Sequence, residues 1–167
     1  MNVLRVFALL FLHIAAAAAA GGDSRLTDQG LGPIMLGMNV RQFSHVLNEP
    51  IAAPRNPNNL DCFYLKATRF PRVSFMFIEG RLRRIDVNTD RVATSDGFRV
   101  GAKMSDVKRR YGARLRDEPH GHDGPESRYL TKQVNRRVAL RFITNATTVN
   151  AIWLGYNDEI QLVEGCS

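Results

Sequence analysis

The chain contains little cysteine and little tryptophan. Of its 167 residues, only Cys62 and Cys166 are cysteines, and Trp153 is the one tryptophan. So few cysteines exclude a small scaffold held by many disulfides, and their wide separation excludes a CxxC redox motif. The chain also lacks the G-x-S-x-G, H-E-x-x-H and P-loop motifs, which excludes the enzyme classes that depend on them. We therefore expect a protein that is not an enzyme and has no cofactor.

The longest hydrophobic run is too short to span a membrane. It extends from Val6 to Ala20, follows the positively charged Arg5, and ends in an A-x-A site formed by Ala18 and Ala20. A membrane-spanning helix needs about 20 apolar residues. The pattern predicts a cleaved secretory signal over residues 1–20, with an uncleaved anchor helix as the alternative. The mature chain, residues 21–167, is then periplasmic or secreted.

Both cysteines lie in the predicted mature chain. In an oxidising compartment an isolated pair normally forms a bridge. We therefore predict a Cys62–Cys166 disulfide, which would tie the middle of the chain to its last residues. Two buried free thiols are the alternative.

Positive charge exceeds negative charge. The chain has 23 Lys and Arg against 16 Asp and Glu, and removal of Arg5 leaves 22 − 16 = +6 for the mature chain. The basic residues cluster at Arg81–Arg84, Lys108–Arg110 and Arg136–Arg137. Because the chain carries an export signal, nucleic acid is a poor candidate partner. The charge favours an acidic partner protein, an acidic glycan or an anionic envelope surface, and a solvated basic surface is the alternative.

Two segments of the chain share one helical pattern. Leu36–Asn48 aligns with Val100–Gly112 without a gap, at an offset of 64 residues. Asn39 is a candidate N-cap for the first helix, and Gly112 is a candidate stop for the second. The apolar residues recur at helical spacing in both segments, at Val40, Phe43 and Leu47 and at Met104, Val107 and Tyr111.

A strand–turn–strand pattern also occurs twice, at Val73–Val87 and at Val138–Leu154. The pattern of a helix followed by strands thus occurs twice in the sequence, which indicates an internal duplication within one mature domain. We predict an α+β fold of two tandem units, at about residues 31–90 and 95–165. Each unit is expected to have one main helix packed on a three- to four-stranded antiparallel sheet.

The segment Gly32–Phe43, with the sequence GPIMLGMNVRQF, resembles the strand–Gly-Met–helix opening of two families of exported repeats. One is the beta-lactamase inhibitor protein family, and the other is the BamE/SmpA-type outer-membrane assembly lipoproteins. Two tandem copies in one exported chain are most similar to the inhibitor family. The resemblance implies helices on one face of an antiparallel sheet, an open second face, and protein binding without catalysis. The chain departs from these patterns at Ala102, where the motif has methionine, in its single cysteine per half, and in lacking a lipobox.

Strand alternation separates a core face from a second face. Val73, Phe75, Phe77, Val138, Leu140 and Phe142 are assigned to the core. Met76, Arg84, Arg141 and Trp153 are assigned to the face that an antiparallel sheet can leave open to solvent. Trp, Arg and Met are enriched in protein interfaces, so these four residues form our candidate binding site. Alternatively, Trp153 fills the seam between the two repeats.

The loop Asp117–Arg128 contains weak candidate metal ligands, His120, His122 and Asp123. An H-x-H pair can ligate zinc or copper, but no third ligand stands at a fixed spacing from it. Two solvated loop histidines are the alternative.

Three classes of function follow from the sequence. The first is an exported, non-enzymatic protein-binding or inhibitor-like module. The second is a structural or assembly accessory of the cell envelope. The third is a small metal-dependent enzyme that uses His120 and His122. The sequence leaves the identity of the partner protein and the oligomeric state open.

Overall fold

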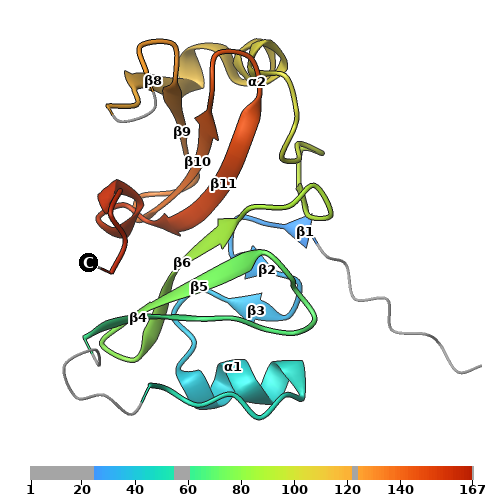
Figure 1. The fold of residues 1–167 in the computed structure, drawn as a ribbon, viewed down its shortest axis with the longest axis vertical. Coiled ribbons are helices and arrows are strands. Elements are labelled where there is room, and N and C mark those ends of the chain that lie inside the picture. Colours follow the sequence, from blue (N-terminus) through green and yellow to red (C-terminus); the bar gives the residue numbers. More distant parts are fainter. Residues whose placement is uncertain (1–24, 55–60, 122–123, 167) are drawn as a thin grey trace, which may run out of the picture.

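The computed structural model describes residues 25–54, 61–121 and 124–166 (Figure 1). Most of its regular structure is β-strand, arranged in sheets of seven and four strands, and its α-helices are short. The predicted signal segment, residues 1–20, lies outside the described residues. Within the described ranges, no helix has the length and apolar composition needed to cross a membrane.

The larger sheet, which we call the large sheet, has seven antiparallel strands from both halves of the chain. In spatial order they are β4 (Cys62–Leu65), β5 (Val73–Ile78), β6 (Arg81–Val87), β11 (Val149–Tyr156), β10 (Val138–Thr144), β9 (Arg128–Gln133) and β8 (Leu115–Pro119). Both predicted hairpins are confirmed, since β5 pairs with β6 and β10 pairs with β11. The two halves join where β6 pairs with β11, with Ile152 opposite Val87.

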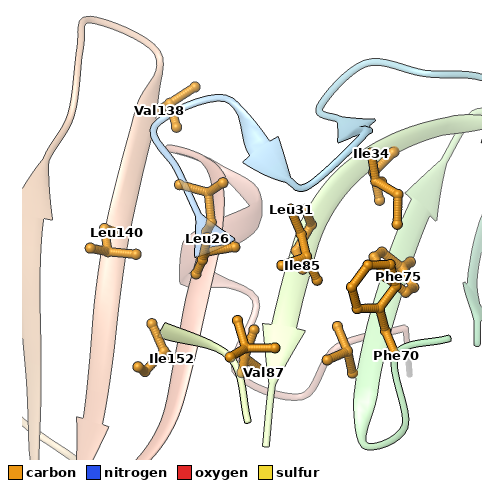
Figure 2. Close-up of a cluster of buried hydrophobic side chains, with 14 of the residues drawn as sticks. Leu26, Leu31, Ile34, Phe70, Phe75, Ile85, Val87, Val138, Leu140 and Ile152 are labelled. Atoms are coloured by element: carbon orange, nitrogen blue, oxygen red, sulfur yellow. The ribbon is translucent and has the colours of Figure 1, made fainter. Parts of the chain in front are cut away.

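The small sheet has four strands of two residues each. Their spatial order is β3 (Ile34–Met35), β2 (Gly30–Leu31), β1 (Arg25–Leu26) and β7 (Ala93–Thr94), and β1 runs parallel to β7. The small sheet lies between the two helices along the molecule (Figure 1). Its apolar side chains face the large sheet, as Figure 2 shows for Leu26 and Leu31 beside Ile85 and Val87.

The two helices lie where the sequence pattern predicts them. Helix α1 spans Val40–Leu47 and α2 spans Met104–Tyr111, followed by the 3₁₀ turn η2 (Gly112–Arg114). Asn39 caps α1, because its side chain accepts from the Gln42 amide while the Gln42 side chain accepts from the Asn39 amide. Each helix has eight residues, which corresponds to a length of only about 12 Å.

A continuous apolar core fills the space between the large sheet and the elements that cover it. Phe43 of α1 packs edge-on against Phe75 and Phe77, with ring centroids 4.8 and 5.5 Å apart. Val107 of α2 belongs to the same cluster of buried residues. The six core residues assigned by strand alternation are all buried, namely Val73, Phe75, Phe77, Val138, Leu140 and Phe142.

The prediction of an α+β fold with two tandem helix-on-sheet units is wrong. The structure is mostly β, and the strands of both halves join in one sheet through the β6–β11 pairing. Two-turn helices are too short to cover this sheet, so the small sheet supplies the missing apolar surface from Leu26, Leu31 and Ile34. The interpretation of the chain as an internal duplication stays a prediction.

After β11 the chain turns back over the opposite face of the large sheet. The returning segment consists of the 3₁₀ turn η3 (Glu159–Gln161) and residues 162–166, and we call residues 159–166 the C-terminal strap. It ends in the Cys62–Cys166 disulfide, with an S–S distance of 2.03 Å, which confirms the predicted bridge. A disulfide is compatible with an oxidising compartment.

Candidate functional site

The predicted binding residues share one face of the large sheet. In the strand register, Arg141 lies opposite Trp153, and Arg84 lies opposite Met76. Residues that face one another across antiparallel strands project to the same side of the sheet. We call this side the second face, because the helices and the small sheet cover the other one.

The expectation that this face is open at Met76, Arg84 and Arg141 is wrong. Their exposed fractions are 0%, 1% and 1%. The C-terminal strap lies over the two arginines, which donate hydrogen bonds to its carbonyl oxygens. Ile160 of the strap is itself fully buried. Trp153 keeps an intermediate exposure beyond the strap. Of the four predicted residues, Trp153 alone therefore reaches solvent to a substantial extent.

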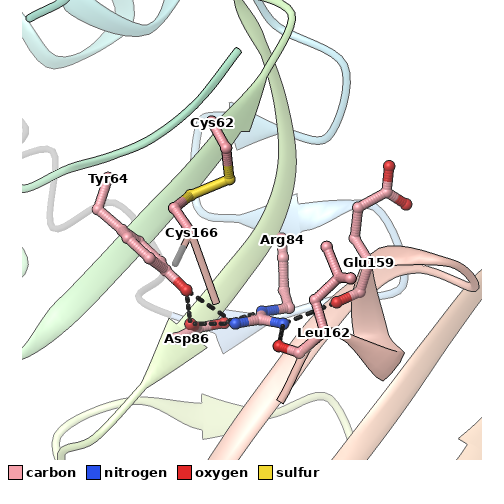
Figure 3. Close-up of a disulfide and its surroundings, with 7 residues drawn as sticks. All are labelled: Cys62, Tyr64, Arg84, Asp86, Glu159, Leu162 and Cys166. Carbon is pink, nitrogen blue, oxygen red and sulfur yellow. Dashed lines mark hydrogen bonds and ion pairs between the residues drawn. A yellow bond between two sulfur atoms is a disulfide. The ribbon is translucent and has the colours of Figure 1, made fainter. Parts of the chain in front are cut away.

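Arg84 is the central hydrogen-bond donor beneath the strap (Figure 3). Its Nε and Nη2 donate to the Asp86 carboxylate at 2.7 and 3.1 Å, and Nη2 also donates to the Tyr64 hydroxyl at 2.8 Å. Its Nη1 donates to the backbone carbonyl oxygens of Glu159 and Leu162, both at 2.7 Å. The five N–H donors of the guanidinium are thereby all used.

Burial and charge act against each other at Asp86. Burial raises the pKa of this carboxyl, while the hydrogen bonds and charge of Arg84 lower it; the net direction is upward. Burial also raises the pKa of Tyr64, and the neighbouring Asp86 charge adds to that shift. Because Arg84 and Tyr64 are its hydrogen-bond partners, Asp86 depends on both for its stability inside the protein.

Arg141 holds the other end of the strap. Its Nη1 donates to the Ile160 carbonyl oxygen at 2.7 Å, and its Nη2 donates to Oε1 of Gln161 at 2.8 Å. Its Nε donates to the Thr131 hydroxyl at 2.9 Å, while the nearest carboxylate in an ion pair with it, that of Glu118, lies 3.9 Å away. Burial without a close counter-charge lowers the pKa of Arg141.

Aromatic rings alternate with these arginines across the second face. The Arg84 guanidinium lies over the Trp153 ring at 4.1 Å from its centroid, and that of Arg141 lies over Tyr129 at 4.7 Å. Tyr129 also packs with Ile143 and Ala151 in a small apolar cluster that Trp153 borders. Trp153 is partly exposed, whereas Tyr129, Ile143 and Ala151 beside it are only 8%, 6% and 8% exposed. We call the residues Trp153, Tyr129, Ile143 and Ala151 the aromatic patch.

The histidine loop is described only in part. The His120 ring packs on Tyr129 at a centroid distance of 4.3 Å, beside the aromatic patch. His122 and Asp123 lie outside the described residues. Within the part of the chain that the structure describes, no three His, Cys, Asp or Glu residues gather in a way that could hold a metal ion. The metal-site hypothesis therefore gains no support from the described residues.

Sequence reasoning missed the strap and the residues that it contacts. Tyr64, Thr131 and the strap carbonyl groups all bind the two arginines. The predicted disulfide could have indicated the strap, because Cys62 and Tyr64 are two residues apart on one strand and their side chains therefore lie on the same face of the sheet. A bridge from Cys62 to the penultimate residue requires the preceding residues to approach that face.

No family model and no curated protein matches the chain. Among solved structures, the uncharacterized protein yfeY from Escherichia coli has a similar fold, with a TM-score of 0.54. The sequence identity is 11%, and the match covers 78% of this chain and 99% of yfeY. At this identity the similarity concerns the fold alone. The resemblance to beta-lactamase inhibitor protein and BamE/SmpA-type repeats gains no support from these comparisons and stays a prediction.

Proposed function

We propose that the protein is an exported, non-enzymatic binding module that docks a partner protein on the aromatic patch. The observation that carries this proposal is the partly exposed Trp153, on whose ring the buried Arg84 guanidinium stacks. Tryptophan and arginine are the residue types that most often dominate the binding energy of interfaces. A ring already fixed by its neighbours loses little conformational entropy when a partner covers it.

The net charge favours an acidic partner. The chain carries 23 basic and 16 acidic residues, so a negatively charged protein surface would be attracted to it and steered toward it. Such attraction raises the association rate and weakens at high salt, whereas the apolar contact with Trp153 would set the lifetime of the complex. Export follows from the predicted signal over residues 1–20 and agrees with the disulfide.

The test compares Trp153→Ala with Tyr156→Ala, a control that removes an aromatic ring from the opposite face of the same strand. Each mature variant is used to capture proteins from the envelope and secreted fractions of the source. A captured protein is then purified and titrated against all variants by calorimetry. Loss of binding by at least tenfold in Trp153→Ala alone, with an unchanged thermal midpoint, supports the proposal. If Trp153→Ala unfolds, or binds as well as the control does, the aromatic patch is not the docking surface.

A second candidate function is contact with an anionic envelope surface. The observation that favours it is the exposure of Leu162 and Val163 on the strap, at 40% each, in a basic protein. Apolar tips and basic residues together favour binding to anionic lipid. Co-sedimentation with phosphatidylglycerol vesicles, which Leu162→Ser and Val163→Ser should reduce and phosphatidylcholine vesicles should not support, would test this candidate.

A further inference from the structure

The C-terminal strap occupies the second face in the manner of a bound peptide. Four oxygen atoms of the strap accept hydrogen bonds from the buried Arg84 and Arg141. They are the carbonyl oxygens of Glu159, Ile160 and Leu162 and the side-chain oxygen of Gln161. Gly165 lies against Tyr64, where a Cβ would come within 2.7 Å of the tyrosine hydroxyl oxygen. These contacts come from side chains of the sheet and not from strand pairing.

All four of these acceptors are uncharged. Asp86 is the carboxylate that hydrogen-bonds to Arg84, whereas the Glu118 carboxylate lies 3.9 Å from Arg141 and is 41% exposed. The strap's own carboxylate, that of Glu159, pairs with Arg83 instead, at 2.6 Å. Two buried positive charges therefore face one closely paired negative charge. Carboxylates make charge-assisted hydrogen bonds to guanidinium groups that are about twice as strong as neutral ones. An acidic segment would thus complement Arg141 better than the strap does.

The disulfide is the covalent anchor of the strap, which the hydrogen bonds from Arg84 and Arg141 also hold. An ion pair between Arg83 and Glu159, at 2.6 Å, adds to these contacts. The backbone hydrogen bonds of the strap among the described residues are local, from Leu162 to Glu159, from Val163 to Gln161 and from Gly165 to Leu162. Cys62 lies on the edge strand β4, and both cysteines are partly exposed. Exposed disulfides are accessible to thiol–disulfide exchange and are more labile than buried ones.

We propose that the second face beneath the strap binds an extended, carboxylate-rich segment of a partner protein after the Cys62–Cys166 bridge is reduced. The strap is the intramolecular occupant of this site in the oxidised protein. The reductant is a dithiol, either a small molecule or a CxxC-type reductase. Its two thiols give two electrons and two protons to the bridge, so Cys62 and Cys166 become thiols while its own sulfurs form a disulfide. The proposal goes beyond the docking function, because Trp153, on which docking depends, is partly exposed with the strap closed.

The protein carries its own reporter for this event. Trp153 is the one tryptophan in the chain, and it stacks on Arg84, which binds two strap carbonyl groups. Release of the strap should therefore change the intrinsic fluorescence of the mature protein. Hydrogen exchange at the amides of Leu162, Val163 and Gly165 should rise on reduction, while the amides within β5 and β10 keep their protection.

The binding test uses oligoglutamate and oligoglutamine peptides of equal length with the oxidised and reduced mature protein. We expect the reduced protein to bind oligoglutamate about tenfold more tightly than the oxidised protein does, and more tightly than it binds oligoglutamine. A Cys62→Ser/Cys166→Ser variant should bind without reductant, and Arg141→Gln in that background should lose the preference for glutamate.

Three results would overturn the proposal: unchanged strap exchange after reduction, equal oligoglutamate binding in both redox states, or equal binding of the two peptides. The comparison of wild type in two redox states remains decisive even if a variant fails to fold. The docking proposal is judged separately, by Trp153→Ala in the oxidised protein, so either proposal can fail without the other.

Discussion

Arg84 and Trp153 are stacked across neighbouring strands, with the guanidinium carbon 4.1 Å from the centroid of the ring. This arrangement depends on Gly155, the residue that lies opposite Arg84 in the strand register. A Cβ at position 155 would come within 2.9 Å of the Arg84 Cγ and 3.0 Å of the Arg83 carbonyl oxygen. The space that glycine leaves is therefore filled by the stem of Arg84.

Gly155→Ala should lower the free energy of unfolding by about 1–3 kcal/mol, the usual effect of overpacking a close contact. It should also change the Trp153 fluorescence, because Arg84 must move. Gly121→Ala is the matched control, since a Cβ there meets no atom within 4 Å. Urea denaturation followed by fluorescence measures both effects. Equal stability of the two variants would show that Arg84 does not need the glycine.

Arg84→Met should be strongly destabilising, because Asp86, which is only 6% exposed in the structure, would lose its guanidinium partner. Breaking a buried pair on one side typically costs about 3–5 kcal/mol. Adding Asp86→Leu to Arg84→Met should recover much of that loss. Arg81→Met, at the exposed start of the same strand, should change stability by less than about 0.5 kcal/mol. The prediction fails if denaturation gives similar free energies of unfolding for Arg81→Met and Arg84→Met.

The Cys62–Cys166 bridge spans 104 residues of sequence and so closes a long loop in the unfolded chain. In the chain-entropy model, its loss in Cys62→Ser/Cys166→Ser should cost about 4.7 kcal/mol. Chemical denaturation of the wild type in reductant should give a similar loss, and the variant should not respond to reductant. A wild type that is equally stable with and without reductant would contradict this role of the bridge.

Asp96 should make stability depend on acid pH. Hydrogen bonds from the Tyr111 hydroxyl and from Arg110, both 2.7 Å long, lower the pKa of this carboxyl. Near its unfolded pKa of about 3.9 the folded protein then binds fewer protons than the unfolded chain. Asp96 therefore adds to the free energy of unfolding above its unfolded pKa, and this contribution is lost as the pH falls through its folded pKa. Urea denaturation of Asp96→Asn from neutral pH downward should show lower stability at pH 7 and a shallower decline in acid. Identical slopes in the variant and the wild type would rule out this role.

The sequence by itself determined the local structure of this protein. Apolar residues three and four apart in Val40–Leu47 and Met104–Tyr111 specify helices, and the period-two pattern of β5 and β10 specifies which side chains are in the core. Asn39 and Gln42 specify the start of α1. The disulfide followed from the isolated pair of cysteines. These features could be predicted because each depends on residues close in sequence or on the chemistry of one residue type.

Only the tertiary structure decided how these pieces combine and which face is open. The pairing of Val87 with Ile152 merges both halves into one sheet, and no local pattern encodes contact between residues so far apart. Alternation placed Arg84 and Arg141 on the second face, but their burial depends on Ile160 and the rest of the strap. The alternation of side chains along a strand predicts the side of the sheet to which a residue points, but it does not predict which segment covers that side. Burial is a property of the segments that meet in space, and here a disulfide brings them together.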